Sequence, residues 1–283
     1  MASRLGIKKT YKLFIDGKFP RTESGRFIDF ADGEGEFLAN VSWGSKKDLR
    51  NAVVAARTAQ AGWASSSAYL KGQILYRIAE VLDGRNSQFV EELIAQGLEE
   101  EKAEREVAEA IDLLVHYAGW SDKYSALFST VNPVASSHFN FSVPEPVGVV
   151  GIIAPESPGL LGLVSVLAPA LVGGNSIVLL ASGKFPLTSI SFAEVLATSD
   201  VPAGVVNILT GKREELAIPF ASHMDLNALL LCGGSPAKNK AVELEAAENL
   251  KRIIKQRDRA LAPSPYHILD LQETKTTWHP VGV

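Results

Sequence analysis

The chain has 283 residues, of which 46% are hydrophobic and 21% are charged, and its formal net charge is -4. This composition excludes a disordered protein, and the even mixture of acidic and basic residues gives no basic surface, so we expect neither nucleic acid nor a membrane as partner. The apolar runs are too short and too often interrupted by Pro or Gly to span a bilayer. Cys232 is the only cysteine, and the first residues lack the apolar core of a signal peptide. We therefore expect a cytoplasmic location.

Residues 11–137 are predicted to form a hairpin followed by short strands and helices. YKLFIDGKF, at 11–19, alternates polar and apolar residues and turns at Asp16-Gly17. Ser45, with Asp48 three residues later, predicts the capping box of a first helix, and Ser67 predicts the start of a second. The remaining predicted elements are strands at Phe27–Phe30 and Phe37–Val41, a short helix around Phe89 and one long helix over Glu99–Phe128, ended by an irregular stretch at Ser129–Ser137.

Residues 145–256 show the pattern of a doubly wound α/β sheet. Gly148–Ala154 and Ser176–Leu180 are continuous apolar runs of the kind found in buried parallel strands. Between them Leu160–Val172 is long enough for a crossover helix, which Gly173-Gly174-Asn175 ends. The alternation continues with strands predicted at Val205–Leu209, Ala228–Leu231 and Leu250–Ile254 and with helices at Leu187–Thr198, Glu214–Ser222 and Pro236–Asn249.

Nine segments together resemble the aldehyde dehydrogenase superfamily in order and spacing. They are YKLFIDGKF, AVVAARTAQAGWA, LYRIAEVL, HYAGWSDK, EPVGVVGIIAP, LAPALVGGNSIVLLASG, PLT, VPAGVVNILTG and NLKRI. The resemblance covers about Lys12 to Ile254 and is greatest to the truncated, degenerate second half of family-16 aldehyde dehydrogenases. It implies a Rossmann-like cofactor domain, with the catalytic domain missing and residues 257–268 forming a linker in its place.

The resemblance also implies that the catalytic groups are lost. Cys232 stands where the family has a Thr at the end of a cofactor-domain strand, so we interpret it as a small core residue and not as the nucleophile. Glu156-Ser157 replaces a Trp-Asn pair whose Asn helps to hold the oxyanion, and losing one such donor typically costs ~10²–10³ in rate. Gln256 stands in place of the general-base Glu, and Gln cannot take up a proton at neutral pH.

The cofactor positions are altered as well. Leu180 and Gly183 replace the Lys and Glu that hold the adenine ribose in the family, although Lys184 could compensate if the loop shifts. Gly233-Gly234-Ser235 could still present backbone N–H groups to a pyrophosphate, but such glycines are more often simple turn residues, and Pro236 removes one donor. We therefore expect no cofactor, with weak NAD(P) binding as the alternative. The vestigial cofactor-binding positions are Ala154, Pro155, Ser182, Gly211, Gly233, Gly234 and Ser235.

The tail and the strand before the parallel sheet are predicted to form an assembly arm. His138–Val143 alternates polar and apolar residues. Leu269–Trp278 resembles the family's C-terminal strand, which in the family pairs with the strand equivalent to His138–Val143. We assign residues 138–144 and 269–279 to a two-stranded β oligomerisation arm, whose exposed edges favour pairing with another chain. The alternative is that both segments fold back on their own domain.

The five histidines share no ligand spacing with one another or with Cys232, so no metal site is expected.

These observations favour a protein that has kept the fold and lost the chemistry. The leading hypothesis is a non-catalytic structural or regulatory module that assembles with itself or with an intact aldehyde dehydrogenase. The alternative is an NAD(P)-dependent aldehyde oxidoreductase that is active only with a partner subunit or a preceding domain. A nucleotide-binding sensor is a third hypothesis. Whether the chain is an enzyme stays open, with the balance against it.

Overall fold

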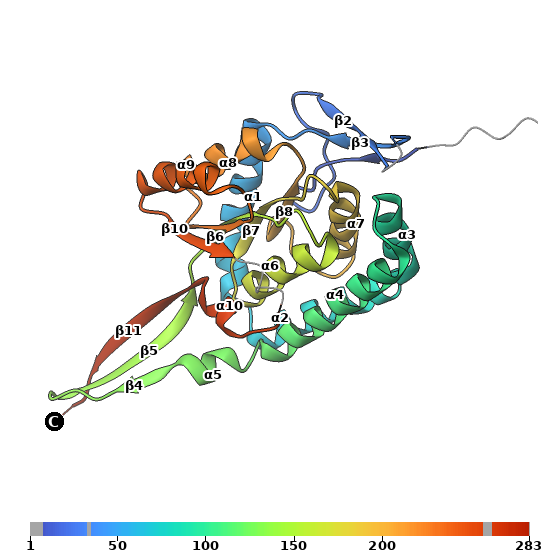
Figure 1. Cartoon of the computed structure of the whole chain (residues 1–283). Coiled ribbons are helices and arrows are strands. Elements are labelled where there is room, and N and C mark those ends of the chain that lie inside the picture. The colour runs from blue at the N-terminus through green and yellow to red at the C-terminus, as the bar shows by residue number, and fades with distance from the viewer. Residues whose placement is uncertain (1–7, 33–34, 257–261, 283) are drawn as a thin grey trace, which may run out of the picture.

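A five-stranded parallel sheet forms the centre of the computed structural model, which describes residues 8–32, 35–256 and 262–282 (Figure 1). The chain begins the sheet in the middle, adds two strands on one side and then two on the other. The switch point therefore lies between β6 and β9, where a doubly wound sheet opens a crevice at its carboxyl edge. The strands, in spatial order, are β10 (Arg252–Gln256), β9 (Ala228–Cys232), β6 (Val149–Ile153), β7 (Ser176–Leu180) and β8 (Val206–Leu209).

Helices cover both faces of this sheet and bury a hydrophobic cluster on each. Every residue of β6, β7 and the first crossover helix α6 (Leu160–Val172) is buried, as the uninterrupted apolar runs predict. The helix and β7 have the predicted bounds. One face carries α6 and α7 (Pro186–Ala197), and the other carries α1 (Lys46–Ser65), α8 (Arg213–Ser222) and α9 (Pro236–Ala247).

The last strand is displaced from its predicted position. β10 begins at Arg252, two residues after the predicted start at Leu250. Leu250 has a φ of 54° and is 94% exposed, so it belongs to the turn that follows α9. A left-handed residue cannot continue into a strand, and the apolar side chain at this position therefore misled the prediction.

Three helices from the N-terminal part pack against α6 and α7. They are α2 (Ala68–Asp83), α3 (Asn86–Ala95) and α4 (Glu100–Trp120). The single long helix predicted over residues 99–128 is wrong, because α4 ends at Trp120 and a separate helix α5 (Tyr124–Phe128) follows a turn. At this turn Ser121 lies directly against Gly72 of α2, whose missing side chain permits the close approach.

The predicted N-terminal hairpin is present in its shortest form. Ile15 and Lys18 exchange both backbone hydrogen bonds, at 2.9 and 3.0 Å, around a turn in which Asp16 and Gly17 have positive φ. Two left-handed residues are the signature of a type I′ turn. Phe14 pairs with Ile208 of β8, which attaches the hairpin to the edge of the parallel sheet. The flanking small sheet consists of β1 (Thr10–Tyr11), β3 (Phe37–Ser42) and β2 (Phe27–Ala31).

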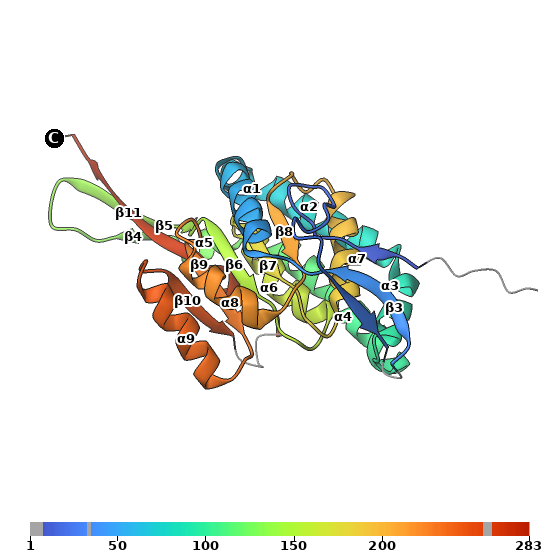
Figure 2. The ribbon, with the colours of Figure 1, turned by 90° about the horizontal axis from the view of Figure 1, so that it is seen from above.

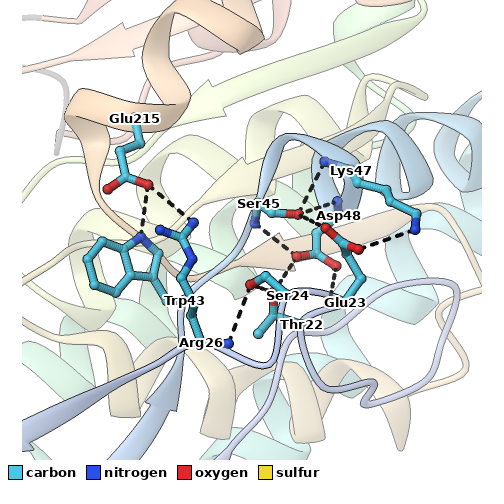
Figure 3. Close-up of polar contacts among 9 residues, drawn as sticks. All are labelled: Thr22, Glu23, Ser24, Arg26, Trp43, Ser45, Lys47, Asp48 and Glu215. Atoms are coloured by element: carbon cyan, nitrogen blue, oxygen red, sulfur yellow. Dashed lines mark hydrogen bonds and ion pairs between the residues drawn. The ribbon is translucent and has the colours of Figure 1, made fainter.

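The predicted capping box at the start of α1 is also present (Figure 3). The Ser45 hydroxyl accepts the N–H of Asp48, and the Asp48 carboxylate accepts the N–H of Ser45 at 2.9 Å. Asp48 is buried and accepts two more hydrogen bonds, from the Thr22 hydroxyl at 2.6 Å and from the Glu23 N–H at 3.2 Å. The cap therefore fixes the loop after the hairpin as well as the helix.

A separate antiparallel sheet projects from the body of the molecule, as Figures 1 and 2 show from two directions. We call this sheet the arm. Its strands, in spatial order, are β11 (Gln272–Pro280), β5 (His138–Pro146) and β4 (Thr130–Asn132). The pairing predicted between the two distant segments is present and runs through nine residue pairs, from Gln272 opposite Pro146 to Pro280 opposite His138. The arm has three strands where two were predicted, because β4 forms within the stretch expected to be irregular.

The predicted linker at 257–268 is partly ordered. Residues 257–261 lie outside the described residues, whereas Tyr266–Leu269 form the short helix α10. Ile268 and Leu271 are fully buried in the main hydrophobic cluster. Ile268 and Leu271 therefore anchor the base of the arm to the core. No helix among residues 8–32, 35–256 and 262–282 is long and apolar enough to cross a membrane.

Candidate functional site

The candidate site is the carboxyl edge of the parallel sheet, because ligands of doubly wound folds bind at this edge near the switch point. All predicted cofactor-binding positions lie in segments that follow strands at this edge. They are Ala154 and Pro155 after β6, Ser182 after β7, Gly211 after β8, and Gly233, Gly234 and Ser235 after β9. Ala154, Pro155 and Ser182 lie together where the ends of β6 and β7 meet. Gly211 instead lies against Gly44 in the turn before α1.

Glu156 is the residue that joins the ends of β6 and β7. Its carboxylate accepts hydrogen bonds from the backbone N–H groups of Gly183, at 2.9 Å, and Lys184, at 3.3 Å. The Ser182 hydroxyl lies 2.9 Å from the carbonyl oxygen of Glu156 and 3.2 Å from its carboxylate. The sequence predicted only that Glu156 would place a negative charge at this edge. The structure shows that this charge is bound by the chain itself.

Arg213, which sequence reasoning did not identify, covers the glycine turn after β9. Its guanidinium donates to the carbonyl oxygens of Cys232, at 2.6 Å, and Gly233, at 3.1 Å. Asn239 of α9 donates to the same Gly233 oxygen, and the Ser235 hydroxyl accepts the N–H of Lys238, at 3.4 Å. The turn therefore has the tight left-handed glycines that were predicted, and two of its carbonyl oxygens and its Ser235 hydroxyl accept hydrogen bonds from within the protein.

Cys232 is a buried residue of this edge and not an exposed nucleophile. Its side chain is 2% exposed, and burial raises the pKa of the thiol to about 12, against a smaller lowering effect of the Arg213 charge. Because the thiolate is the nucleophilic form, a thiol with this pKa is almost wholly unreactive at neutral pH. The sequence offered no cation beside Cys232, and the structure supplies Arg213 from α8.

The two predicted degenerate positions lie at the same edge of the sheet. Ser157 is exposed in the turn after β6, directly after Glu156. Gln256 ends β10, and its backbone is in register with Cys232 of β9. Its side chain lies outside the described part of the structure. Their oxyanion-stabilising and base roles stay predictions about what the chain has lost.

A cavity of about 200 Å³ lies beside the glycine turn, between α8 and α9. Its lining combines aliphatic side chains with charged and amide side chains from the two helices. The lining residues are Arg213, Glu214, Ala217, Ile218, Lys238, Asn239, Ala241 and Val242.

A larger groove, of about 720 Å³, lies elsewhere, between α2 and α4. Its lining includes the exposed Tyr69 and Tyr76, but none of the predicted site residues. It is formed by the outer surfaces of helices, away from the strand ends where backbone donors converge. We therefore place the candidate site at the smaller cavity and the sheet edge, where position in the fold outweighs size.

A second cluster joins the start of α8 to the turn before α1 (Figure 3). The Trp43 indole N–H donates to the Glu215 carboxylate at 3.2 Å, and Arg26 donates to the same oxygen at 3.3 Å. Arg26 and Lys212 both lie over the Trp43 ring, 4.6 and 4.3 Å from its centroid. These contacts hold the first turn of α8 against the turn before α1.

Within the described ranges no group of three or more His, Cys, Asp or Glu side chains could hold a metal ion.

Comparison with known proteins agrees with this fold. The Aldehyde dehydrogenase family profile matches residues 20–256. The mitochondrial benzaldehyde dehydrogenase of Antirrhinum majus is 31% identical over 247 residues, which cover 86% of this chain and 46% of that protein. The human mitochondrial 10-formyltetrahydrofolate dehydrogenase is 28% identical over 253 residues, covering 87% of this chain and 27% of that protein.

Solved structures give the same result. The NAD+ complex of an aldehyde dehydrogenase from Bacillus cereus superposes with a TM-score of 0.83 at 25% identity, covering 87% of this chain and 50% of that one. The betaine aldehyde dehydrogenase of Staphylococcus aureus in complex with NAD+ also gives 0.83 at 25% identity, covering 87% and 49%. The chain thus spans about half the length, or less, of these relatives. The α/β fold, the sheet topology and the family profile together show that the chain belongs to the aldehyde dehydrogenase family.

Proposed function

We propose that the chain is a non-catalytic aldehyde dehydrogenase-like module that assembles, through the arm, with another copy of itself or with an intact aldehyde dehydrogenase. The observation that carries this proposal is the arm. It is a three-stranded sheet that stands away from the body, although it includes segments from distant parts of the chain. A sheet this small is marginal by itself, and its open edges favour pairing with another chain.

The surface of the arm supports a role in assembly. Phe139 is 46% exposed, Trp278 is 58% exposed and Val131 is 68% exposed. Phe139 stacks beside Phe141, and Trp278 lies edge to face against His138. Large apolar side chains concentrated on a small projecting sheet are typical of a protein interface.

The state of the carboxyl edge supports the absence of catalysis. The only thiol is buried with a raised pKa, and the loop after β7 is bound to Glu156. Neither arrangement offers a nucleophile or an open nucleotide site. We accordingly expect no bound cofactor, or NAD(P) with weak affinity only.

Measuring the native mass of the purified chain tests assembly. We expect an oligomer that a Phe139→Ser/Trp278→Ser double variant converts to monomer, because the change removes the two exposed rings from the arm. Tyr69→Ser is the matched control, since Tyr69 is 72% exposed on α2, outside the arm. A monomeric wild type that also fails to bind an intact aldehyde dehydrogenase contradicts the proposal, as does an oligomer that both variants leave unchanged.

Steady-state assays test the absence of catalysis. We expect no NADH production from benzaldehyde or betaine aldehyde by the chain alone. Turnover that Cys232→Ser abolishes would refute this expectation.

The alternative is an NAD(P)-dependent aldehyde oxidoreductase completed by a partner subunit or by a preceding domain. Two observations favour it: the cavity between α8 and α9, and the likeness to solved NAD+ complexes. Mixing the chain with an intact aldehyde dehydrogenase separates the two proposals. Under the alternative, the rate of NADH production exceeds that of the partner alone.

The expected cytoplasmic location is also a proposal, since the relatives' names place them in both mitochondria and cytosol.

A further inference from the structure

Backbone donors in two segments at the carboxyl edge of the sheet are engaged by side chains of the protein itself. In the loop after β7, the Glu156 carboxylate accepts the N–H groups of Gly183 and Lys184 and lies 3.2 Å from the Ser182 hydroxyl. Gly183 and Lys184 are exposed, so these donors lie at the surface and would be accessible to a ligand without the carboxylate. The loop faces the edge at which a fold of this type binds nucleotides.

Two other contacts close the same edge. Arg213 lies directly on the turn after β9, where a Cβ added to Gly234 would be 2.7 Å from the guanidinium. At the start of α6, the buried Glu106 carboxylate accepts the N–H groups of Leu160, at 2.6 Å, and Leu161, at 3.3 Å. A helix N-terminus normally attracts an anion, and here the anion is a side chain.

We propose that Glu156 is an internal ligand, whose carboxylate occupies the hydrogen-bond donors of residues 182–184 and so excludes an oxygen-rich external ligand such as the ribose or phosphate of a nucleotide. One carboxylate oxygen accepts the N–H groups of Gly183, at 2.9 Å, and Lys184, at 3.3 Å, and the Lys184 N–H also donates to the Ser182 hydroxyl at 3.0 Å. Backbone donors that converge on one oxygen atom form the arrangement that such a ligand would use. A tethered carboxylate competes at high effective concentration, so the fraction of molecules with open donors is small. The apparent affinity for an external ligand is the intrinsic affinity multiplied by that small fraction.

This inference goes beyond the proposed function, because it assigns a specific self-occupied state to one loop. It depends neither on assembly through the arm nor on the absence of turnover. If Glu156 only braced the loop, its removal would lower stability without creating any binding. Ligand binding therefore distinguishes an internal ligand from a simple brace.

The test compares wild type with Glu156→Ala and Glu156→Gln, with Glu145→Ala as the matched control. Glu145 carries the same charge but pairs with Lys275 in the arm. Calorimetric titration uses AMP, with adenosine to separate ribose from phosphate recognition. Amide hydrogen exchange at Gly183 and Lys184 is measured in parallel. Exchange at Gly183 reports directly whether the carboxylate protects this amide and needs no ligand, and the Lys184 amide, which the Ser182 hydroxyl also accepts at 3.0 Å, serves as an internal reference.

We expect the Gly183 amide to exchange faster in Glu156→Ala than in wild type, and the Lys184 amide to change less because the Ser182 hydroxyl still accepts it. We expect AMP to bind about tenfold or more tightly to the variant. Glu156→Gln should bind more weakly than Glu156→Ala, because its amide oxygen can still accept. Glu145→Ala should behave as wild type. Unchanged exchange would show that the contact does not hold in solution, and faster exchange without tighter AMP binding would show that it excludes nothing. Either result overturns the proposal.

Discussion

Glu106 caps the N-terminus of α6 from within the core, and its removal gives a sharp test of how this helix is held. The side chain is 7% exposed, and its carboxylate accepts the N–H groups of Leu160 and Leu161. Glu106→Ala leaves these two donors buried without an acceptor, and each orphaned donor costs about 1–3 kcal/mol. Since the helix end can relax in part, we expect a loss of about 2–4 kcal/mol in the free energy of unfolding.

Glu106→Gln is the matched control, because it keeps an acceptor oxygen and removes the buried charge. We expect it to cost about 1 kcal/mol or less at pH 7, since removing a buried charge offsets part of the weaker hydrogen bonding. Urea unfolding followed by the fluorescence of the four tryptophans, of which Trp63 is buried, measures both variants. A loss in Glu106→Ala no larger than in Glu106→Gln would refute the capping role.

The pH dependence of the stability difference between wild type and Glu106→Gln gives a second measurement. Burial raises the pKa of the Glu106 carboxyl above its ordinary value of 4.5, against the lowering effect of the backbone N–H groups. The folded state therefore takes up the proton at a higher pH than the unfolded state. Relative to Glu106→Gln, wild type should gain stability as the pH falls toward 4.5 and lose it as the pH rises through the folded pKa. A difference that does not change over this range would contradict the raised pKa.

Three further predictions concern a cap, a buried cation and the thiol. Asp48→Ala should lower the free energy of unfolding by about 2 kcal/mol, as measured in urea, because Asp48 accepts three hydrogen bonds at the start of α1; a loss below that of Lys47→Ala at the same helix end would contradict this. Burial lowers the pKa of Lys251 to about 8, so wild type should gain stability relative to Lys251→Met as the pH rises from 8 toward 10.5. Unfolding at pH 7.5 and pH 10 tests the sign. Cys232 should react with iodoacetamide at pH 8 at least ~100-fold more slowly in the native protein than in urea; equal rates would show that the thiol is accessible.

The centre of the fold was predictable because its signals are local. β7 and α6 are continuous apolar runs, and the residues that end α6, Gly173-Gly174-Asn175, follow directly in the sequence. β4 was not predictable, because Thr130–Asn132 becomes a strand only by pairing with β5, where Val131 lies opposite Phe141. Three residues beside a proline carry no periodicity from which a strand could be predicted.

The candidate site was likewise predictable in part, where its signals are local in the sequence. The sequence placed Ser182 and the glycine turn at strand ends, which needs only the order of elements. It could not reveal that the Glu156 carboxylate bonds to Gly183, 27 residues later, or that Arg213 reaches the carbonyl of Cys232, 19 residues later. Both contacts depend on how the crossovers bring neighbouring strand ends together, and a charged side chain in a loop gives no sign of its partner.

The pairing of β5 with β11 constrains the order in which the chain can fold. All five strands of the parallel sheet lie between these two segments in the sequence. Pairing segments so far apart carries a large loop-closure entropy unless the intervening chain has already folded. α10, which the buried Ile268 attaches to the core directly before β11, supplies that preorganisation. We therefore expect the full β5–β11 pairing to form after the parallel sheet. A partner that binds the arm, as we propose, would then meet this surface only on molecules whose sheet is complete.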